Sequence, residues 1–249
     1  MIFVTGDCHA NYTKFHKQKF RIQKELTKDD YMIICGDFGL WHDGAIEREN
    51  FDILNKRNFT TLFIDGNHEN FDRLYKEFPE EEWHGGRIHR IRDSILHLER
   101  GQVFEIAGKK FFTFGGARSH DISSGILNPS EEDFERQYYR LNKLGASFRV
   151  LGESRWPEEM PGEKEMEEGQ RNLELHNNKV DYIITHCAPS SDVGLYGQGL
   201  YKTDELTDYF QEILLNIDFT KWFYGHYHED RYITDKTEML YNSIKLLPE

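Results

Sequence analysis

Cysteine, proline and long apolar runs are scarce in this sequence of 249 residues, which holds three cysteines and six prolines. Cys8, Cys35 and Cys187 are odd in number and include no CxxC pair, so neither a disulfide framework nor a structural zinc site is indicated. We expect reduced thiols that fill small apolar gaps at strand ends. No apolar run approaches the roughly 18 residues of a membrane span, and the chain opens on strand-like residues 2–4 rather than on a signal peptide. These absences predict a cytoplasmic protein with no membrane partner.

Basic residues are outnumbered as well, since 31 Lys and Arg stand against 44 Asp and Glu, giving a formal net charge of -13. Long nucleic acids bind clustered Lys and Arg, so this balance disfavours long RNA or DNA as a partner. A small anionic substrate would need a local positive centre such as bound metal ions. With 38% apolar and 14% aromatic residues, the composition is that of a globular protein, and we expect a single domain over residues 1–249.

The most informative stretch is Ile64–Asn70, which follows the apolar run Thr61–Ile64 and places an amide beside an imidazole. Gly66 lets the chain turn sharply at the end of a buried strand, so that Asn67 and His68 face the carboxyl edge of a sheet, where open α/β sheets bind ligands. Taken alone, such a stretch is more often a turn that caps a helix. Its interpretation as a site depends on what else reaches the same edge.

Two earlier apolar runs end in the same way, because residues 2–5 precede Asp7 and residues 31–34 precede Asp37. The spacing is regular: 37 − 7 = 30 and 67 − 37 = 30, about the length of one strand-helix-strand unit. Right-handed crossovers are the default for such units. The pattern therefore predicts three parallel strands that deliver Asp7, Asp37 and Asn67 to one edge.

Other periodic patterns predict the remaining elements. Helices are expected over residues 15–26, 46–54, 71–78, 134–141 and 206–214, and strands over 95–98, 103–106, 111–114, 180–185 and 222–224, with two short strands around 234–237. The three brief runs between 95 and 114 suggest hairpins, and so a second sheet with antiparallel pairing. Ser130 and Asp133 resemble a capping box for the helix that follows them.

An acidic insertion occupies residues 153–169, where Pro157 and Pro161 interrupt a run rich in Glu. A solvated loop is the commoner interpretation of such a charge run. The alternative is a lid over the cleft, whose Glu side chains would repel polyanions while Trp156 or Met160 covers a small ligand.

Histidines follow the later strands. His186 comes directly after one apolar run, and His226 and His228 come after another with the same alternation as Asp7 and His9. Each alone would ordinarily be a hydrogen-bonded structural residue. Together they form a mixed set of carboxylate, imidazole and amide donors, which suits Mn, Fe or Zn.

This order of motifs closely resembles the calcineurin-like metallophosphoesterase superfamily. The family's GDxH, GD, GNH[DE], H and GHxH blocks match 6–9, 36–37, 66–69, His186 and 225–228. The resemblance implies an α/β fold of two facing mixed β-sheets flanked by helices, an αββα sandwich. It also implies hydrolysis of phosphomono- or diesters by a hydroxide that bridges two divalent or trivalent metal ions.

The resemblance also implies a role for each matched residue. One metal ion would be held by Asp7, His9, Asp37 and His228, and the second by Asp37, Asn67, His186 and His226. Asp37 would bridge the two ions. Asn67 and His68 would contact the substrate, and His68 would assist the leaving group as the catalytic residue.

The sequence departs from the branch of this family that dephosphorylates proteins. Leu40, Trp41 and Asp65 stand where that branch has the arginines of its phosphate clamp and the acid that pairs with its catalytic histidine. Protein phosphatase activity is therefore disfavoured, and we expect a small phosphoester or nucleotide as substrate. Arg118 or His120, in a glycine-rich loop, could supply the phosphate contacts instead.

Two other classes of protein share features with this sequence. The retromer's phosphoesterase-like subunit is a protein-binding scaffold, but it lacks the catalytic histidine that His68 matches here. A redox di-iron protein would want a carboxylate-rich helical bundle, which the strand pattern disfavours. The full set of ligands together with His68 favours an enzyme over a metal-binding scaffold.

Overall fold

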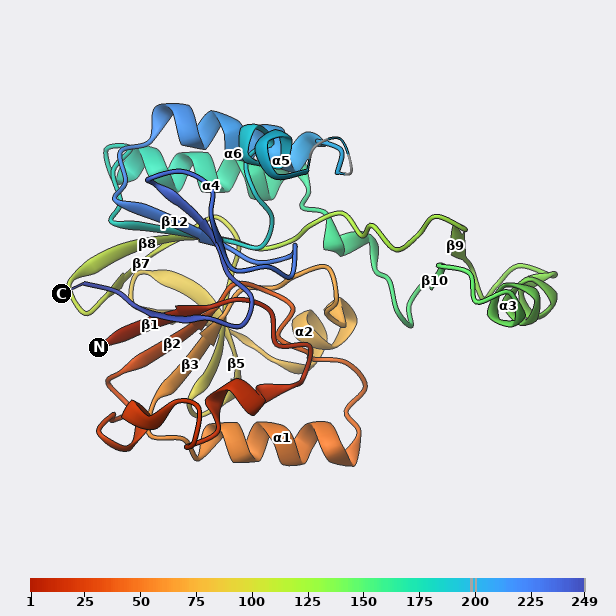
Figure 1. Ribbon diagram of the computed structural model, residues 1–249, viewed down its shortest axis with the longest axis horizontal. Coiled ribbons are helices and arrows are strands. Elements are labelled where there is room, and N and C mark those ends of the chain that lie inside the picture. Colours follow the sequence, from red (N-terminus) through yellow and green to blue (C-terminus); the bar gives the residue numbers. More distant parts are fainter. Residues whose placement is uncertain (198, 200, 249) are drawn as a thin grey trace.

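The computed structural model describes residues 1–197, 199 and 201–248, which form two facing mixed sheets with helices on their outer faces (Figure 1). The first sheet has the strand order β15 (Ile244–Leu246), β1 (Ile2–Thr5), β2 (Tyr31–Ile34), β3 (Thr60–Phe63), β6 (Ile95–Leu98), β5 (Gly86–Arg92) and β4 (Glu80–Trp83). The second has the order β13 (Arg231–Tyr232), β14 (Thr237–Met239), β12 (Lys221–Tyr224), β11 (Tyr182–Thr185), β8 (Lys109–Phe114) and β7 (Gln102–Ile106). The predicted fold class is confirmed.

Helices cover both sheets. The α-helices are α1 (Ala45–Asn55), α2 (Phe71–Glu77), α3 (Phe134–Lys143), α4 (Glu163–Leu175), α5 (Ser190–Gly197) and α6 (Glu205–Asn216). The short 3₁₀ helices are η1 (Tyr12–Phe15), η2 (Arg21–Lys24) and η3 (Pro157–Glu159). Helices α1 and α2 lie on the first sheet, and α4, α5 and α6 lie on the second (Figure 1). Within the described part of the chain, no helix is long and apolar enough to cross a membrane.

The core follows from the two-residue period of the strands, since successive side chains point to opposite faces. In β2, Met32 and Ile34 pack beneath the helices of the first sheet, whereas Ile33 packs between the two sheets. Phe111 and Ile184 of the second sheet meet Ile33 in that inner layer. Strands buried on both faces read as continuous apolar runs, which is why they stand out in the sequence.

The first three strands pair in parallel and in register, with Ile2 opposite Tyr31 and Tyr31 opposite Thr60. This confirms the arrangement predicted from the 30-residue spacing. Asp7, Asp37 and Asn67 follow the carboxyl ends of neighbouring strands.

The helix predicted over residues 15–26 is wrong, because this segment forms η1 and η2 joined by turns. Gln23 explains the difference. Its buried side-chain amide donates to the carbonyls of Phe15 and Phe20, at 2.9 and 2.7 Å, and thereby satisfies backbone groups without a continuous helix. The apolar residues still enter the core, but from turns.

The hairpin prediction is confirmed for β7 and β8, which pair antiparallel with Gln102 opposite Thr113. It is wrong for a hairpin between β6 and β7, because β6 belongs to the other sheet, where it pairs antiparallel with β5 and parallel with β3. In the second sheet, β8, β11, β12 and β14 all pair in parallel, so antiparallel pairing is limited to its two edges over the described residues. Short apolar runs fix where strands occur but not which strand each one meets.

Residues 121–155, here called the arm, project from the body between β8 and α4 (Figure 1). The arm holds α3 and the strand pair β9 (Ile126–Leu127) and β10 (Arg149–Val150), and it has a small apolar cluster of its own. The capping box predicted for α3 is wrong: Ser130 bonds to Asn128, and Asp133 is the N-cap without a side-chain cap bond.

The loop expected over the acidic insertion is wrong for residues 163–169, which begin α4. One face of this helix packs on the second sheet through Gly169 and Leu173. Its acidic side chains serve ion pairs, since Glu168 meets Arg87 at 2.6 Å. The Glu-rich part of the sequence from residue 163 is therefore the start of an amphipathic helix and not a solvated loop.

Candidate metal centre and pocket

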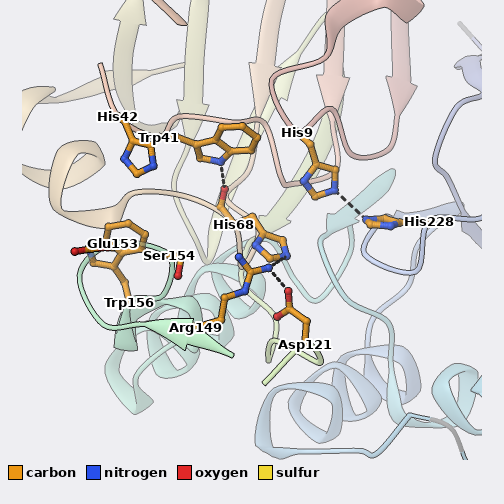
Figure 2. Close-up of a pocket in the computed structure, with 10 residues that line it drawn as sticks. All are labelled: His9, Trp41, His42, His68, Asp121, Arg149, Glu153, Ser154, Trp156 and His228. Atoms are coloured by element: carbon orange, nitrogen blue, oxygen red, sulfur yellow. Dashed lines mark hydrogen bonds and ion pairs between the residues drawn. The ribbon is translucent and has the colours of Figure 1, made fainter. Parts of the chain in front are cut away.

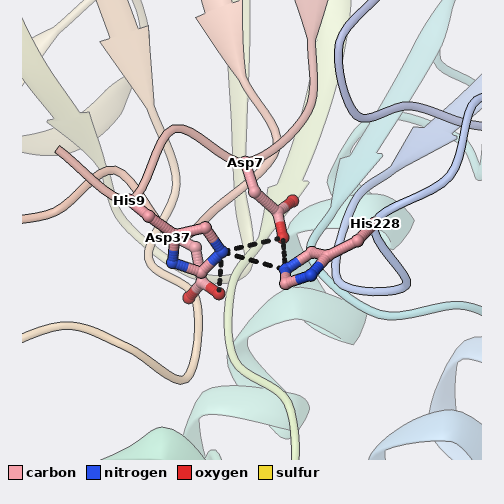
Figure 3. A group of neighbouring side chains, drawn as sticks. All are labelled: Asp7, His9, Asp37 and His228. Atoms are coloured by element: carbon pink, nitrogen blue, oxygen red, sulfur yellow. Dashed lines mark hydrogen bonds and ion pairs between the residues drawn. The ribbon is translucent and has the colours of Figure 1, made fainter. Parts of the chain in front are cut away.

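Four of the predicted ligands converge at the carboxyl ends of the strands: Asp7, His9, Asp37 and His228, with one donor atom from each lying within 4.8 Å of the others (Figure 3). The Nε2 atoms of His9 and His228 are 2.9 Å apart, and Asp7 Oδ2 lies 3.2 Å from His228 Nε2. His9 Nε2 is 3.6 Å from Asp37 Oδ2. Ligands bonded at 2.0–2.2 Å to one ion lie roughly 3–3.5 Å from one another, so this group fits a metal ion.

A second group shares Asp37 with the first. Nε2 of His186 lies 3.4 Å from Asp37 Oδ1 and 3.1 Å from Asn67 Oδ1. The other ring nitrogen, Nδ1, bonds to the carbonyl of Cys35 at 2.7 Å. That bond fixes the ring so that Nε2 faces the carboxylate, which is the usual arrangement of a metal-binding histidine.

His226 lies beside this second group. Its ring lies 5.0 Å from that of His186, centroid to centroid, and its backbone N–H donates to Asp7 Oδ1 at 3.0 Å. Burial and the neighbouring His186 hold the pKa of His226 well below its usual value, so the imidazole is neutral, as a metal ligand must be.

The backbone at these positions is held in an uncommon conformation. His9, Asp37, His226 and His228 have φ values of 45°, 47°, 70° and 54°, in the left-handed region that residues other than glycine seldom adopt. Such residues cluster where a surrounding structure forces a side chain into a required direction. Four of the residues predicted to bind metal are therefore held in this conformation, which other described residues such as Asp43 and Asn177 also adopt.

The motif glycines are explained by close approach. A Cβ atom on Gly66 would lie 2.0 Å from Asp37 Oδ1, and one on Gly225 would lie 2.1 Å from Asp7 Oδ1. Each glycine thus leaves room for a carboxylate that comes from a different motif. The carboxylates of Asp37 and Asp7 can therefore occupy their positions only because a neighbouring motif has glycine at the point of contact.

The buried carboxylates of Asp7 and Asp37 favour positive charge beside them. Burial raises the pKa of Asp37, but the charge and hydrogen bond of His186 outweigh burial and hold it well below its usual value. Burial lowers the pKa of His186, but Asp37, Asp7 and the hydrogen bond to Cys35 together outweigh burial and raise it to about 9. A buried cluster that draws a proton onto an imidazole in this way is suited to a cation.

His68 lies beside this cluster. Its backbone N–H donates to Asp37 Oδ1 at 2.8 Å, and its ring is 5.5 Å from that of His9. Burial lowers the pKa of its imidazole, although Asp37 opposes this. The ring faces a cavity of about 550 Å³ (Figure 2), lined by His9, Trp41, His42, His68, Asp121, Arg149, Glu153, Ser154, Trp156 and His228.

Arg118 does not line this pocket. Its guanidinium pairs with Asp204 at 3.2 Å and with Glu205 at 2.9 Å. His120, from the same loop, lies near the second group, with its ring 4.8 Å from that of His226.

Sequence reasoning missed three residues of the site. Glu69 is buried, and its carboxylate accepts the N–H groups of Phe38 at 2.5 Å and Leu40 at 2.9 Å, which ties the loop after β2 to the loop after β3. The motif contains this residue, but nothing in the pattern says what it holds. Asp121 and Arg149 come from the arm, whose position no local pattern indicates.

Comparison with known proteins agrees with this geometry. The family model for calcineurin-like phosphoesterases matches residues 1–230, so the chain belongs to that family. Among curated proteins, the chain is 25% identical over 262 residues to lariat debranching enzyme A of Xenopus laevis. The match covers 91% of this chain and 42% of the relative, so the chain spans less than half the length of that protein. The resemblance stated from the motifs is confirmed.

Proposed function

We propose that this protein is a metal-dependent phosphoester hydrolase with a dinuclear centre. The observation that carries the proposal is the shared carboxylate: Asp37 reaches His9 of one donor group with one oxygen and His186 of the other with its second oxygen. A carboxylate placed between two sets of donors is suited to bridge two ions. Mn, Fe or Zn fit the mixture of oxygen and imidazole nitrogen donors.

Asp7, His9, Asp37 and His228 would hold one ion, and Asp37, Asn67, His186 and His226 the other. Two such ions, when bound, lower the pKa of a shared water molecule and neutralise phosphoryl oxygens.

His68 serves the other half of the reaction. Its ring stands at the cavity wall but its backbone, not its ring, contacts Asp37. It would orient the substrate and give a proton to the leaving-group oxygen, the part of a general acid.

The pocket favours a small phosphoester or a nucleotide. Glu153 places negative charge at its wall, and the whole chain carries a net charge of -13. Long polyanions would be repelled, most strongly at low salt. Trp41 and Trp156 offer apolar walls for the rest of a small substrate.

The test combines metal analysis with a substrate panel. Purified protein loaded in turn with Mn, Fe, Zn and Mg is assayed on phosphomonoesters, phosphodiesters, nucleotides and, because of the relative's name, a lariat RNA. We expect hydrolysis of small esters. Asp37→Ala should lose both metals and the activity, because a bridging carboxylate serves both ions. Asp218→Ala, which removes an exposed carboxylate that pairs with Lys179, is the matched control.

Two outcomes would contradict the proposal. Wild-type metal content in a folded Asp37→Ala protein would remove the dinuclear assignment. A metal-loaded wild-type protein that hydrolyses nothing in the panel would instead favour the metal-binding scaffold for protein interaction.

A further inference from the structure

The arm brings one arginine into the pocket. Arg149 opens β10, and its Nη2 atom lies 3.5 Å from Nε2 of His68 (Figure 2). The same nitrogen forms an ion pair with Asp121. Figure 2 shows the guanidinium between the imidazole and the carboxylate, at the cavity wall. A residue more than 80 positions away in sequence thus meets the residue predicted to act as the acid.

The structure of the arm fixes the position of Arg149, whose side chain is not freely mobile on the surface. Arg149 pairs with Ile126 in the strand ladder, and the next residue, Val150, is buried in the arm's own apolar cluster. The Arg149 side chain is 23% exposed. Burial raises the pKa of the Asp121 carboxyl, but the hydrogen bond and charge of Arg149 outweigh burial and hold it below its usual value. Asp121 is therefore ionised at neutral pH and holds the guanidinium in place.

Among the described residues that line the cavity, Arg149 is also the one permanently cationic side chain. Other arginines of the body are engaged elsewhere: Arg100 is buried against Asp65, and Arg118 pairs with Glu205 outside the pocket. The arginines with which related protein phosphatases clamp phosphate are missing from the matching positions. Positive charge on the His68 side of the pocket therefore comes from the arm.

The guanidinium retains donors for a ligand. Its side-chain bonds to described residues all use Nη2, so Nε and Nη1 have no partner among the residues that the structure describes. A guanidinium presents five N–H donors in a planar fork that matches two oxygens of a phosphoryl group. Lysine carries the charge without the fork.

We propose that Arg149 is a substrate-binding residue that contacts the phosphoryl oxygens beside His68, with Asp121 as the positioning residue that aims it. This rests on the proposed phosphoester hydrolase function. A phosphomonoester carries more negative charge at neutral pH than a diester, because its second pKa is near 6. Arg149 therefore biases the site towards monoesters.

The test measures kcat and KM of wild type, Arg149→Gln, Arg149→Lys and Asp121→Asn on a matched monoester and diester. We expect Arg149→Gln to lower kcat/KM for the monoester by about 10- to 100-fold, the equivalent of one charged hydrogen bond, and for the diester by less. Arg149→Lys should recover part of the loss, and Asp121→Asn should show a smaller loss with the same bias. Arg136→Gln removes an exposed charge from α3 of the same arm and should match wild type.

Binding of inorganic phosphate to the Mn-loaded protein, followed by calorimetry, gives a readout independent of turnover. Arg149→Gln should weaken phosphate binding by about tenfold or more, whereas Arg136→Gln should not. Equal phosphate affinity in wild type and Arg149→Gln would overturn the inference, as would equal losses on monoester and diester. Failure of the proposed function would look different, since wild type itself would then hydrolyse none of the esters.

Discussion

The buried ion pair between Asp65 and Arg100 offers a sharp test of how the site is supported. Asp65 stands two residues before Asn67, its side chain is 0% exposed, and that of Arg100 is 3% exposed. Asp65 Oδ2 accepts from Arg100 Nε at 2.9 Å and Nη2 at 2.6 Å, while Oδ1 lies 3.1 Å from Nε2 of His97. The carboxylate therefore has a partner on each oxygen.

Asp65→Asn keeps the shape of the side chain but leaves the Arg100 charge buried without its main partner. Breaking a buried pair in this way costs about 3–5 kcal/mol. Glu165→Gln is the matched control, because Glu165 pairs with the same guanidinium at 3.2 Å but is 39% exposed. A pair of that exposure contributes about 1 kcal/mol or less.

The assay is urea unfolding of wild type and the two variants, compared through their midpoints and slopes. It should be repeated over a pH series. Burial raises the pKa of Asp65, but Arg100 and His97 outweigh burial and hold it well below its usual value. A carboxyl with a lowered folded pKa stabilises the protein above its unfolded pKa near 4 and loses that contribution as the pH falls towards the folded pKa. The difference between wild type and Asp65→Asn should therefore be constant above about pH 5 and narrow below about pH 4. Equal losses for Asp65→Asn and Glu165→Gln at neutral pH would refute the reasoning.

Three further predictions concern the site itself. His68→Ala should keep its metals and lose activity by about 10²–10⁴-fold, with a smaller loss on aryl esters whose leaving group needs no proton; equal losses on aryl and alkyl esters would count against an acid role. Gly66→Ala should lower the metal content, because its methyl group would lie 2.0 Å from Asp37 Oδ1, whereas Gly44→Ala, which meets nothing within 4 Å, should bind metal normally; metal analysis of both variants decides. Glu153→Gln should raise the rate on polyanionic substrates relative to small ones, most at low salt, and an unchanged ratio would mean that Glu153 is merely solvated.

The sequence was sufficient for the parts of the fold that depend on local pattern. The runs that became β1, β2 and β3 are apolar, short and followed by glycine, so their position and parallel order could be predicted together with Asp37 at their common edge. These signals are strong because strands buried on both faces leave little choice of residue. The seven predicted metal ligands follow such strands. The structure brings Asp7, His9, Asp37 and His228 into one group, and it places His186 beside Asp37 and Asn67.

What could not be predicted depends on tertiary contacts. Gln23 satisfies the carbonyls of Phe15 and Phe20 through its side chain, and the spacing of apolar residues carries no information about such a contact. Only Gly169 and Leu173 of α4 are buried, so the acidic residues of its exposed face determined the sequence-based prediction of a loop. Arg149 of the arm lies beside His68 through a tertiary contact, and no residue near Arg149 in sequence marks it as part of a site.

Because the arm has a small apolar core of its own, it could open without the rest of the protein and remove two residues from the pocket wall. Leu127, Leu141 and Val150 form a cluster that shares no member with the three clusters of the body. A segment with so few buried contacts opens at a lower free energy than the sheets, and its backbone amides should exchange with solvent sooner. Each opening would withdraw Arg149 and Asp121 while the residues around Asp37 stay in place. The protein would then alternate between a complete pocket and an exposed metal centre, and a bound phosphoester that contacts Arg149 would shift the balance towards the complete pocket.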